Sequence, residues 1–221
     1  MLDQLYILPV LLFSVVVHEV AHGWMALRLG DTTARDMGRL TLNPFPHIDP
    51  IGSVLVPLLS IAASGHVFIA WAKPVPVNPL NFLHHRRDYI LVSVIGPISN
   101  FVLAFVCTLV VIAIANIRSV VHVADAIVND VLRVFLEMFA GGITLNIMLA
   151  VFNMLPIPPL DGSHVLASLL PDELSVKYRR IGFAGILFLL ILMRWEPFSR
   201  SFASMIHVLH SPFQLLIDTF S

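Results

Sequence analysis

Two histidines and a glutamate stand together near the start of the chain, in the order His18, Glu19 and His22. Residues four apart in an α-helix are separated by about 6 Å along the axis and about 40° around it, so both imidazoles can share one ion. This H-E-x-x-H pattern is typical of metallopeptidases, in which two neutral histidines bind zinc. Glu19 would then be the general base that activates the metal-bound water.

The position of these residues is as informative as their spacing. They lie inside an apolar run from about Leu5 to Leu29. Ionisable side chains within a membrane helix cost about 2.5 to 3.5 kcal/mol each on insertion scales. A bound ion would offset that cost, and hydrogen bonds from the three side chains to neighbouring helices are the alternative.

A catalytic zinc usually has three protein ligands and one open position, so a further ligand must come from elsewhere. The candidates are Asp161, Asp49, His47, His66, His164 and Glu137. Asp161 is distinctive because Pro156, Pro158 and Pro159 stop a helix just before it. Irregular backbone at membrane depth is tolerated only inside protein or beside a wet cavity. The alternative is that Asp161 is an ordinary helix N-cap at a membrane surface.

Composition indicates the solvent in which these residues act. Of 221 residues, 57% are apolar or aromatic and 12% are charged, against about 25% charged in an average soluble domain. A mean hydropathy of +0.88 therefore predicts a multi-span membrane protein. A net charge of −1 without long basic runs argues against nucleic-acid binding. The single cysteine, Cys107, excludes a disulfide framework and a cysteine-based metal site.

Four apolar runs approach the roughly 20 residues that a membrane span needs. They are Leu5 to Leu29, Tyr89 to Ala115, Phe135 to Leu155 and Ile181 to Trp195. Two weaker candidates are Ile51 to Trp71 and Phe198 to Phe220. We therefore expect four to six spans, with a water-facing connection or a surface helix from Asn116 to Arg133. In a six-span arrangement the loops of the two sides carry six and seven basic residues, so the positive-inside rule predicts no orientation.

Two segments between these runs have the pattern of short extended chains. Met37 to Asn43 alternates polar and apolar residues, and Lys73 to Pro79 has a proline at every second or third position. We expect both to be edge-like strands, which could hold an extended substrate by strand addition or merely cover the mouth of a cavity.

Three asparagines are candidates for polar groups near the site. Asn153 and Asn146 fall on one helix face because seven residues return to within about 20° of the start. Asn100 follows Pro97, where we expect a helix kink. We expect Asn153 to hold the substrate backbone or the developing oxyanion, and Asn146 to bond between helices. For Asn100, facing the substrate and bracing a helix crossing are equally plausible.

Taken together, the motifs resemble those of the site-2 proteases, the zinc intramembrane metalloproteases, and most closely the short bacterial type without a PDZ domain. The resemblance covers nearly the whole chain. It rests on His18-Glu-x-x-His22, Gly38-Arg-Leu-Thr-Leu-Asn-Pro44 with His47-Ile-Asp-Pro50, Ala72-Lys-Pro-Val-Pro-Val-Asn-Pro79, Gly96-Pro97-x-x-Asn100, and Asn153-x-x-Pro-x-Pro-Pro-Leu-Asp161-Gly162.

The resemblance implies a fold and a set of site residues. The fold is an all-α membrane protein, a polytopic helical bundle with a small β-strand element near the active site, forming one domain over residues 1–221. Asp161 becomes the third ligand of one Zn²⁺ per chain, Glu19 the catalytic base, and Asn153 a polar group beside the site.

The implied function is an intramembrane zinc endopeptidase in a bacterial cell membrane. Its substrates would be membrane-anchored proteins, of which single transmembrane helices are the simplest kind. The alternatives are a non-catalytic membrane zinc-binding or transport module, and a metallohydrolase of lipids or small molecules. A transporter would be expected to carry acids and histidines on several spans. Oligomeric state and regulation are not predicted.

Overall fold

The structure, a computed structural model, describes residues 7–55, 72–120 and 126–221. Its α-helices are α1 (Ile7–Arg28), α2 (Thr33–Asp36), α4 (His85–Val120), α5 (Ala126–Asn153), α6 (Asp161–Leu169), α7 (Asp172–Arg179), α8 (Ala184–Arg194) and α9 (Glu196–Phe220). Short turns of other helix types are η2 (Phe45–His47), η3 (Pro50–Leu55) and η4 (Pro79–Asn81).

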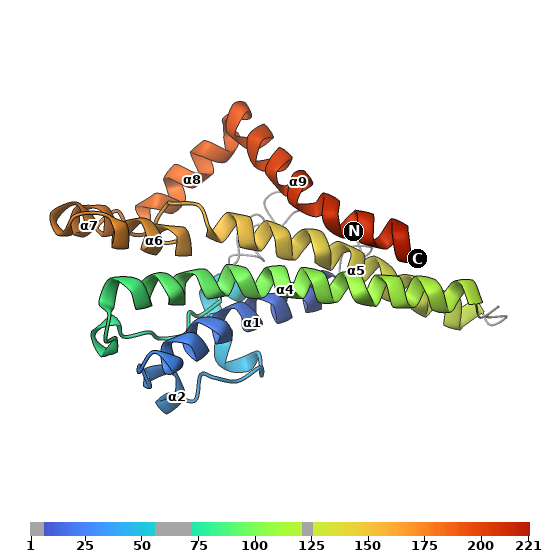
Figure 1. Cartoon of the computed structure of the whole chain (residues 1–221), viewed down its shortest axis with the longest axis horizontal. Helices are drawn as coiled ribbons and strands as arrows, with labels where there is room; N and C mark the ends of the chain where they lie inside the picture. Colours follow the sequence, from blue (N-terminus) through green and yellow to red (C-terminus); the bar gives the residue numbers. More distant parts are fainter. Residues whose placement is uncertain (1–6, 56–71, 121–125) are drawn as a thin grey trace.

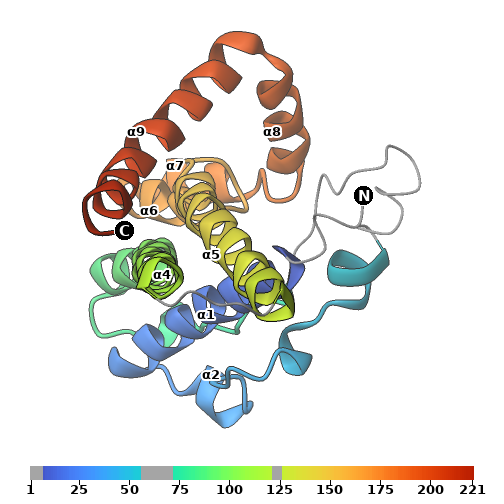
Figure 2. The ribbon, with the colours of Figure 1, turned by 90° about the vertical axis from the view of Figure 1, so that its right-hand side faces the viewer.

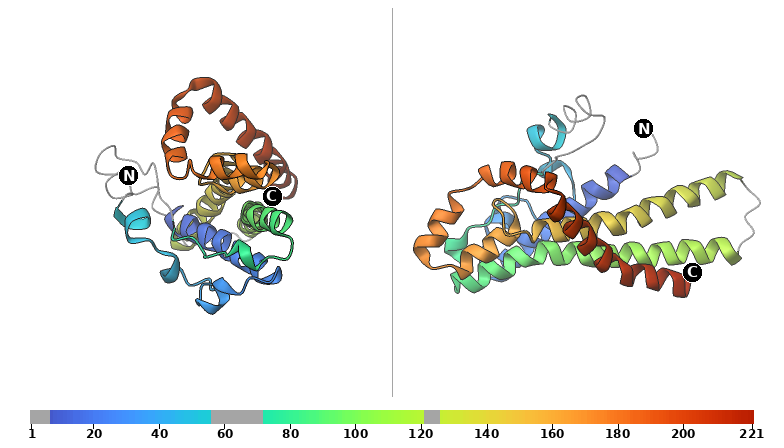
Figure 3. Two further views of the ribbon diagram at one scale, coloured as in Figure 1. Left: turned by 90° about the vertical axis from the view of Figure 1, so that its left-hand side faces the viewer. Right: turned by 90° about the horizontal axis from the view of Figure 1, so that it is seen from above.

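Helices α1, α4 and α5 lie side by side and form the body of the molecule (Figure 1, Figure 2). Helices α1 and α4 are antiparallel, because His18 contacts Asn100 whereas His22, later in α1, contacts Val92, earlier in α4. With 36 residues, α4 is about 54 Å long. Together with α5 it extends well past α1 (Figure 3).

The main hydrophobic core lies between α4 and α5. Its buried members recur every three or four residues on each helix, as a shared apolar face requires: Ala104, Cys107, Val111, Ile143, Ile147 and Val151. Helix α9 crosses this pair (Figure 3). Its apolar face packs against the core through Phe202, Ile206, Leu209, Phe213 and Ile217.

Three helices in the described part of the chain are long and apolar enough to cross a membrane. They are Ile7–Arg28, His85–Arg118 and Ile127–Asn153. The run ending at Trp195 forms only the 11-residue α8, and the last candidate belongs to the amphipathic α9. Most of the Ile51 to Trp71 candidate lies outside the described residues.

Of the two alternatives for Asn116 to Arg133, the described residues are helical. Helix α4 continues to Val120, and α5 already begins at Ala126. Arg133 lies 3.9 Å from both Asp130 and Glu137, at the spacings that support a helix. Local charge pairing thus supports the start of α5 before its apolar run.

The expected β-strand element is wrong: no strand occurs among residues 7–55, 72–120 and 126–221. Residues 72–79, which we call the strap, lack regular secondary structure up to Asn78, and Pro79 begins the η4 turn. Prolines remove every second or third N–H of the strap, and the N–H groups of Val75 and Asn78 donate to the carboxylates of Glu19 and Asp31. A β-ladder needs those N–H groups, so none forms.

Candidate active site

Three potential metal-binding atoms meet where α1, α4 and α6 come together. The Nε2 atoms of His18 and His22 are 3.1 Å apart, and they lie 3.0 and 3.3 Å from Oδ2 of Asp161. Both imidazoles are buried and the carboxylate is mostly so. The structure thus brings together the H-E-x-x-H histidines and the acid that lies some 140 residues later.

Hydrogen bonds fix which nitrogen of each imidazole faces this cluster. Nδ1 of His18 lies 2.6 Å from Oδ1 of Asn100, and Nδ1 of His22 lies 2.6 Å from the carbonyl oxygen of Val92. Both partners are acceptors, so each Nδ1 carries the proton and each Nε2 presents a lone pair. This is the form in which histidine binds a metal.

The charge of the cluster also calls for a cation. Burial raises the pKa of the Asp161 carboxyl, but an adjacent imidazole that carries a proton in place of a metal ion outweighs burial and holds that pKa well below its ordinary value. The carboxylate is therefore ionised. Its oxygen faces two nitrogen lone pairs, an arrangement that is repulsive unless a positive ion lies between them.

The dimensions of the cluster fit zinc. Bonds of about 2.0 to 2.2 Å to nitrogen and oxygen at tetrahedral angles separate neighbouring ligand atoms by about 3.3 to 3.5 Å. The three observed separations, 3.0 to 3.3 Å, are close to that value. Two histidines and one carboxylate are also a donor set of catalytic zinc sites that leave one position open.

Gly96 allows α4 to cross α1 at this point. A Cβ atom on Gly96 would overlap the His22 ring and lie 2.7 Å from Cε1 of His18. The two imidazoles therefore occupy the space in which a side chain at residue 96 would lie. Gly96 precedes Pro97, whose missing N–H interrupts the hydrogen bonding of α4.

The proline-rich turn after α5 places Asp161 at the start of α6. Asp161 is the first helical residue, and the N-cap is Leu160, which makes no side-chain cap. Asp161 is therefore not the N-cap of α6. At Gly162 a Cβ would overlap the carbonyl of Met154, so glycine is required for α6 to pack onto the end of α5.

Glu19 is held by the strap. Its Oε2 accepts a hydrogen bond of 2.7 Å from the backbone N–H of Val75. Within the described part of the chain, Oε1 has no hydrogen-bond partner. One oxygen thus anchors the carboxylate and the other stays available.

The asparagines occupy different places. Asn100 and Asn146 are fully buried; Asn100 bonds to His18 and donates to Asn146, which donates in turn to the Gly142 carbonyl. Asn100 therefore has no face open to a substrate here. Asn153 is half-buried, and its Nδ2 donates to the carbonyl of Leu149 one turn earlier.

The other candidate ligands lie outside the cluster. His47 bonds to the Thr41 carbonyl, the Asp49 carboxylate accepts from the Gly52 N–H, and Glu137 lies beside Arg133. His164 lies one turn after Asp161 and bonds to Tyr89. His66 is outside the described residues.

Two contributors to the site had no chemical signal in the sequence. Val92 acts through its backbone carbonyl, so no side chain could have indicated it. Gly96 acts by lacking a side chain, and only the glycine and proline pair within a long apolar run marked its position.

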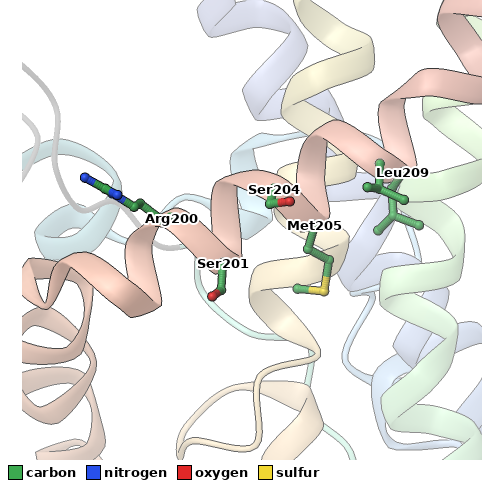
Figure 4. A pocket seen from close by; sticks show the side chains of 6 residues that line it. Arg200, Ser201, Ser204, Met205 and Leu209 are labelled. Atoms are coloured by element: carbon green, nitrogen blue, oxygen red, sulfur yellow. The ribbon is translucent and has the colours of Figure 1, made fainter.

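A hollow on the surface of α9 is unrelated to this chemistry. It is lined by Arg200, Ser201, Ser204, Met205, Val208 and Leu209, all on the one helix (Figure 4). None of these residues belongs to the histidine and aspartate cluster, so the hollow is not the candidate active site.

Fold and site together define a helical protein with spans long and apolar enough for a membrane, and with a cluster of two histidines and one aspartate that has the geometry of a catalytic zinc site. Comparison with known proteins identifies the family. The sequence profile described as peptidase family M50 matches residues 83–193. The chain belongs to this family, that of the site-2 proteases, and is a zinc metalloprotease.

Curated relatives agree with this assignment. The chain is 35% identical over 187 residues to "Putative zinc metalloprotease YwhC" of Bacillus subtilis, covering 85% of this chain and 79% of that protein. It is 31% identical over 194 residues to "Putative zinc metalloprotease Rip2" of Mycolicibacterium smegmatis, covering 83% of this chain and 67% of that protein. No solved structure gives a significant match.

The comparisons bear on the earlier alternatives. Membership in a peptidase family means that the protein is an enzyme acting on a protein substrate, which excludes the non-catalytic zinc-binding or transport module. The M50 match begins after His22, so it includes Asp161 but not the H-E-x-x-H residues.

Proposed function

We propose that the protein is an intramembrane endopeptidase that hydrolyses peptide bonds of membrane-anchored proteins within or near the bilayer. The observation that carries the proposal is the triangle of His18, His22 and Asp161 atoms, 3.0 to 3.3 Å on a side, between helices long enough to span a membrane. Glu19 on the same helix supplies a carboxylate beside that triangle.

His18, His22 and Asp161 would hold the zinc ion. When bound, zinc polarises a scissile carbonyl and lowers the pKa of water from 15.7 to about 7. Asn100 and Val92 orient the two imidazoles from behind. Such outer partners fix the ring positions and raise the basicity of the ligands.

Glu19 is the general base of the proposed mechanism. Its anchored Oε2 restricts the rotation of the carboxylate, and Oε1 takes the proton of the attacking water. The same oxygen then delivers that proton to the nitrogen of the leaving amine. The Val75 N–H, which holds Oε2, keeps the base in one orientation through both transfers.

Asn153 is the proposed substrate-binding residue. It ends α5 directly before the turn that carries Asp161. Its Oδ1 has no hydrogen-bond partner among the described residues and can accept from a backbone N–H of the substrate. Asn100 is a positioning residue for His18 in this proposal, because its carboxamide is fully buried.

The proposed substrate is a membrane-anchored protein, in the simplest case a single transmembrane helix. A helix hides its peptide bonds, so the segment to be cleaved must unwind before Glu19 and the zinc can act on it. We propose that the whole chain, 1–221, is one catalytic domain in a bacterial cell membrane. The number of spans is at least the three that the described helices provide.

Replacement of the base tests the mechanism directly. Glu19→Gln keeps the length of the side chain and a hydrogen-bond acceptor for Val75, but it removes the proton acceptor. We expect unchanged zinc content and a loss of cleavage of about 100-fold or more, the contribution of a general base. Metal analysis of the purified protein and a comparison of membrane proteomes from cells with active and Glu19→Gln enzyme measure both effects.

Two matched variants separate the ligands from the base. Asp161→Asn and His22→Ala should lower zinc content, whereas Glu19→Gln should not. Cleavage by Glu19→Gln at the wild-type rate would disprove the role of the base, and full zinc content in Asp161→Asn would disprove that ligand. Proteins that accumulate only in Glu19→Gln membranes are the candidate substrates.

A further inference from the structure

A second polar pair lies next to the metal-binding cluster and has no part in the mechanism above. The hydroxyl of Tyr89 is 3.1 Å from Nδ1 of His164, and the centroids of the two rings are 5.2 Å apart. Both residues are half-buried. The pair joins α4 to α6, the two helices that meet α1 at the site.

Helix periodicity places both side chains on the faces that build the site. His164 follows Asp161 by three residues in α6, so the two share a face. Tyr89 precedes Val92 by three residues and Gly96 by seven, which puts it on the same face of α4. Val92 and Gly96 both contact the His22 ring.

The hydrogen bond between the two rings leaves a donor unused. Burial lowers the pKa of the His164 imidazole, so the ring is neutral near pH 7 and carries one N–H. If Tyr89 donates its hydroxyl proton to Nδ1, that N–H is at Nε2. Among the described residues, Nε2 of His164 has no hydrogen-bond partner.

A third residue restrains Tyr89 from the other side. The guanidinium carbon of Arg179 lies 5.0 Å from the centroid of the Tyr89 ring, within cation–π range. The ring is therefore held between α7 and α6, with its hydroxyl directed at His164.

We propose that His164 is a further catalytic residue, whose Nε2–H donates to the carbonyl oxygen of the scissile peptide bond as that oxygen gains negative charge. Tyr89 is the positioning residue that fixes the tautomer and orientation of His164. The inference rests on the proposed function, in which Glu19 and the zinc act on the same carbonyl. Donors aimed at a developing oxyanion are among the largest contributions to catalysis.

The test measures binding of a tetrahedral anion, so that it does not depend on turnover. The probe is a phosphonamidate peptide, which resembles the transition state of peptide hydrolysis, bound to the zinc-loaded enzyme in detergent. Acetohydroxamate, which needs only an intact metal site, is the reference ligand. We expect His164→Leu to weaken phosphonamidate binding about 100-fold and to leave zinc content and acetohydroxamate binding unchanged.

Further variants distinguish donation from packing. His164→Gln retains an N–H donor and should recover part of the affinity that His164→Leu loses. Tyr89→Phe keeps the ring against Arg179 but removes the hydroxyl, and should weaken binding about 10-fold, as for one lost hydrogen bond. Tyr178→Phe, which removes a hydroxyl bonded to the Pro156 carbonyl, is the matched control and should change binding less than twofold.

The possible outcomes separate this inference from the proposed function. Equal phosphonamidate affinity in the wild type and His164→Leu would overturn the role of His164 and leave the peptidase site intact. Lower zinc content in His164→Leu and Tyr89→Phe, with weaker binding of both ligands, would make the pair structural only. Failure of the zinc-loaded wild type to bind the phosphonamidate would overturn the proposed function as well.

Discussion

Individual residues show which parts of the site a sequence can reveal. The helical spacing of His18 and His22 is local, so their common face could be predicted. Asp161 could be identified only as one candidate among several, because its position depends on how the proline-rich turn folds onto α5. The family resemblance, and not the spacing, singled it out.

Gly96 is the residue whose importance was least visible in the sequence. We expect Gly96→Ala to displace the His22 ring, because the added Cβ would overlap it. Zinc content should fall severalfold, and the free energy of unfolding should drop by about 1 to 3 kcal/mol, the usual cost of overpacking, which lowers the melting temperature. Gly38→Ala is a control for loss of glycine alone, since nothing lies within 4 Å of its Cβ position, although its positive φ adds some strain. Normal zinc binding by Gly96→Ala would contradict the close approach of α4 to α1.

Asn100 offers a second test at this scale. Asn100→Ala removes the acceptor for Nδ1–H of His18 and leaves Asn146 without its donor. We expect zinc affinity to fall about 10- to 100-fold, the usual effect of losing an outer partner of a metal ligand. Competition with a chelator measures the affinity. An unchanged affinity would show that His18 is oriented by other contacts.

Among the elements, the helices were largely predictable and the strap was not. Long apolar runs predicted α1, α4 and α5, although α4 and α5 extend beyond those runs, α5 with the support of local charge pairs. The alternation of Lys73 to Pro79 predicted an extended chain but not its partners. Those partners are carboxylates and an arginine from distant parts of the sequence, which no periodicity encodes.

Asp31 connects the strap to the end of α1. Its carboxylate is fully buried and accepts bonds from the Thr33 N–H and hydroxyl, the Asn78 N–H and the Asn81 amide. Burial raises the pKa of Asp31, but these bonds together lower it below its ordinary value of 3.8. The ionised Asp31 carboxylate therefore stabilises the fold fully above pH 3.8. This stabilisation is lost as the pH falls through the lower pKa that Asp31 has in the folded state.

This linkage gives a prediction for the element as a whole. We expect Asp31→Asn to lower stability at pH 7 by about 1 to 3 kcal/mol, because Asn can accept fewer of these bonds. The difference in melting temperature between the variant and the wild type should shrink below pH 3.8. Thermal unfolding in detergent between pH 3 and pH 7 measures it. A difference that stays constant over this range would show that the Asp31 charge is not involved.

For the whole molecule, contacts show which loops lie at the same end, which residue counting could not. Arg39 donates to the strap carbonyls of Lys73 and Pro74, and Arg86 pairs with Asp172 of α7. The loops that follow α1, precede α4 and carry α7 thus lie at one end of the molecule. We call it the basic end, and it holds Arg28, Arg35, Arg39, Lys73, Arg86, Arg87, Lys177, Arg179 and Arg180.

The positive-inside rule then predicts that the basic end faces the cytoplasm. A cysteine at Lys177 should react with a membrane-impermeant maleimide only after the cells are permeabilised. A cysteine at Arg118, at the far end of α4, should react in intact cells. The native Cys107 is buried and provides a silent background. The reverse labelling pattern would reverse the orientation.

The candidate active site lies much closer to one end of α4 than to the other. Val92, which holds His22, lies about 10 Å along α4 from His85 and about 39 Å from Arg118. The reaction centre is therefore shallow when approached from one surface and deep from the other. Under the proposed function, a substrate helix lying alongside α4 would be severed close to one leaflet, so that most of its hydrophobic length would stay with a single product.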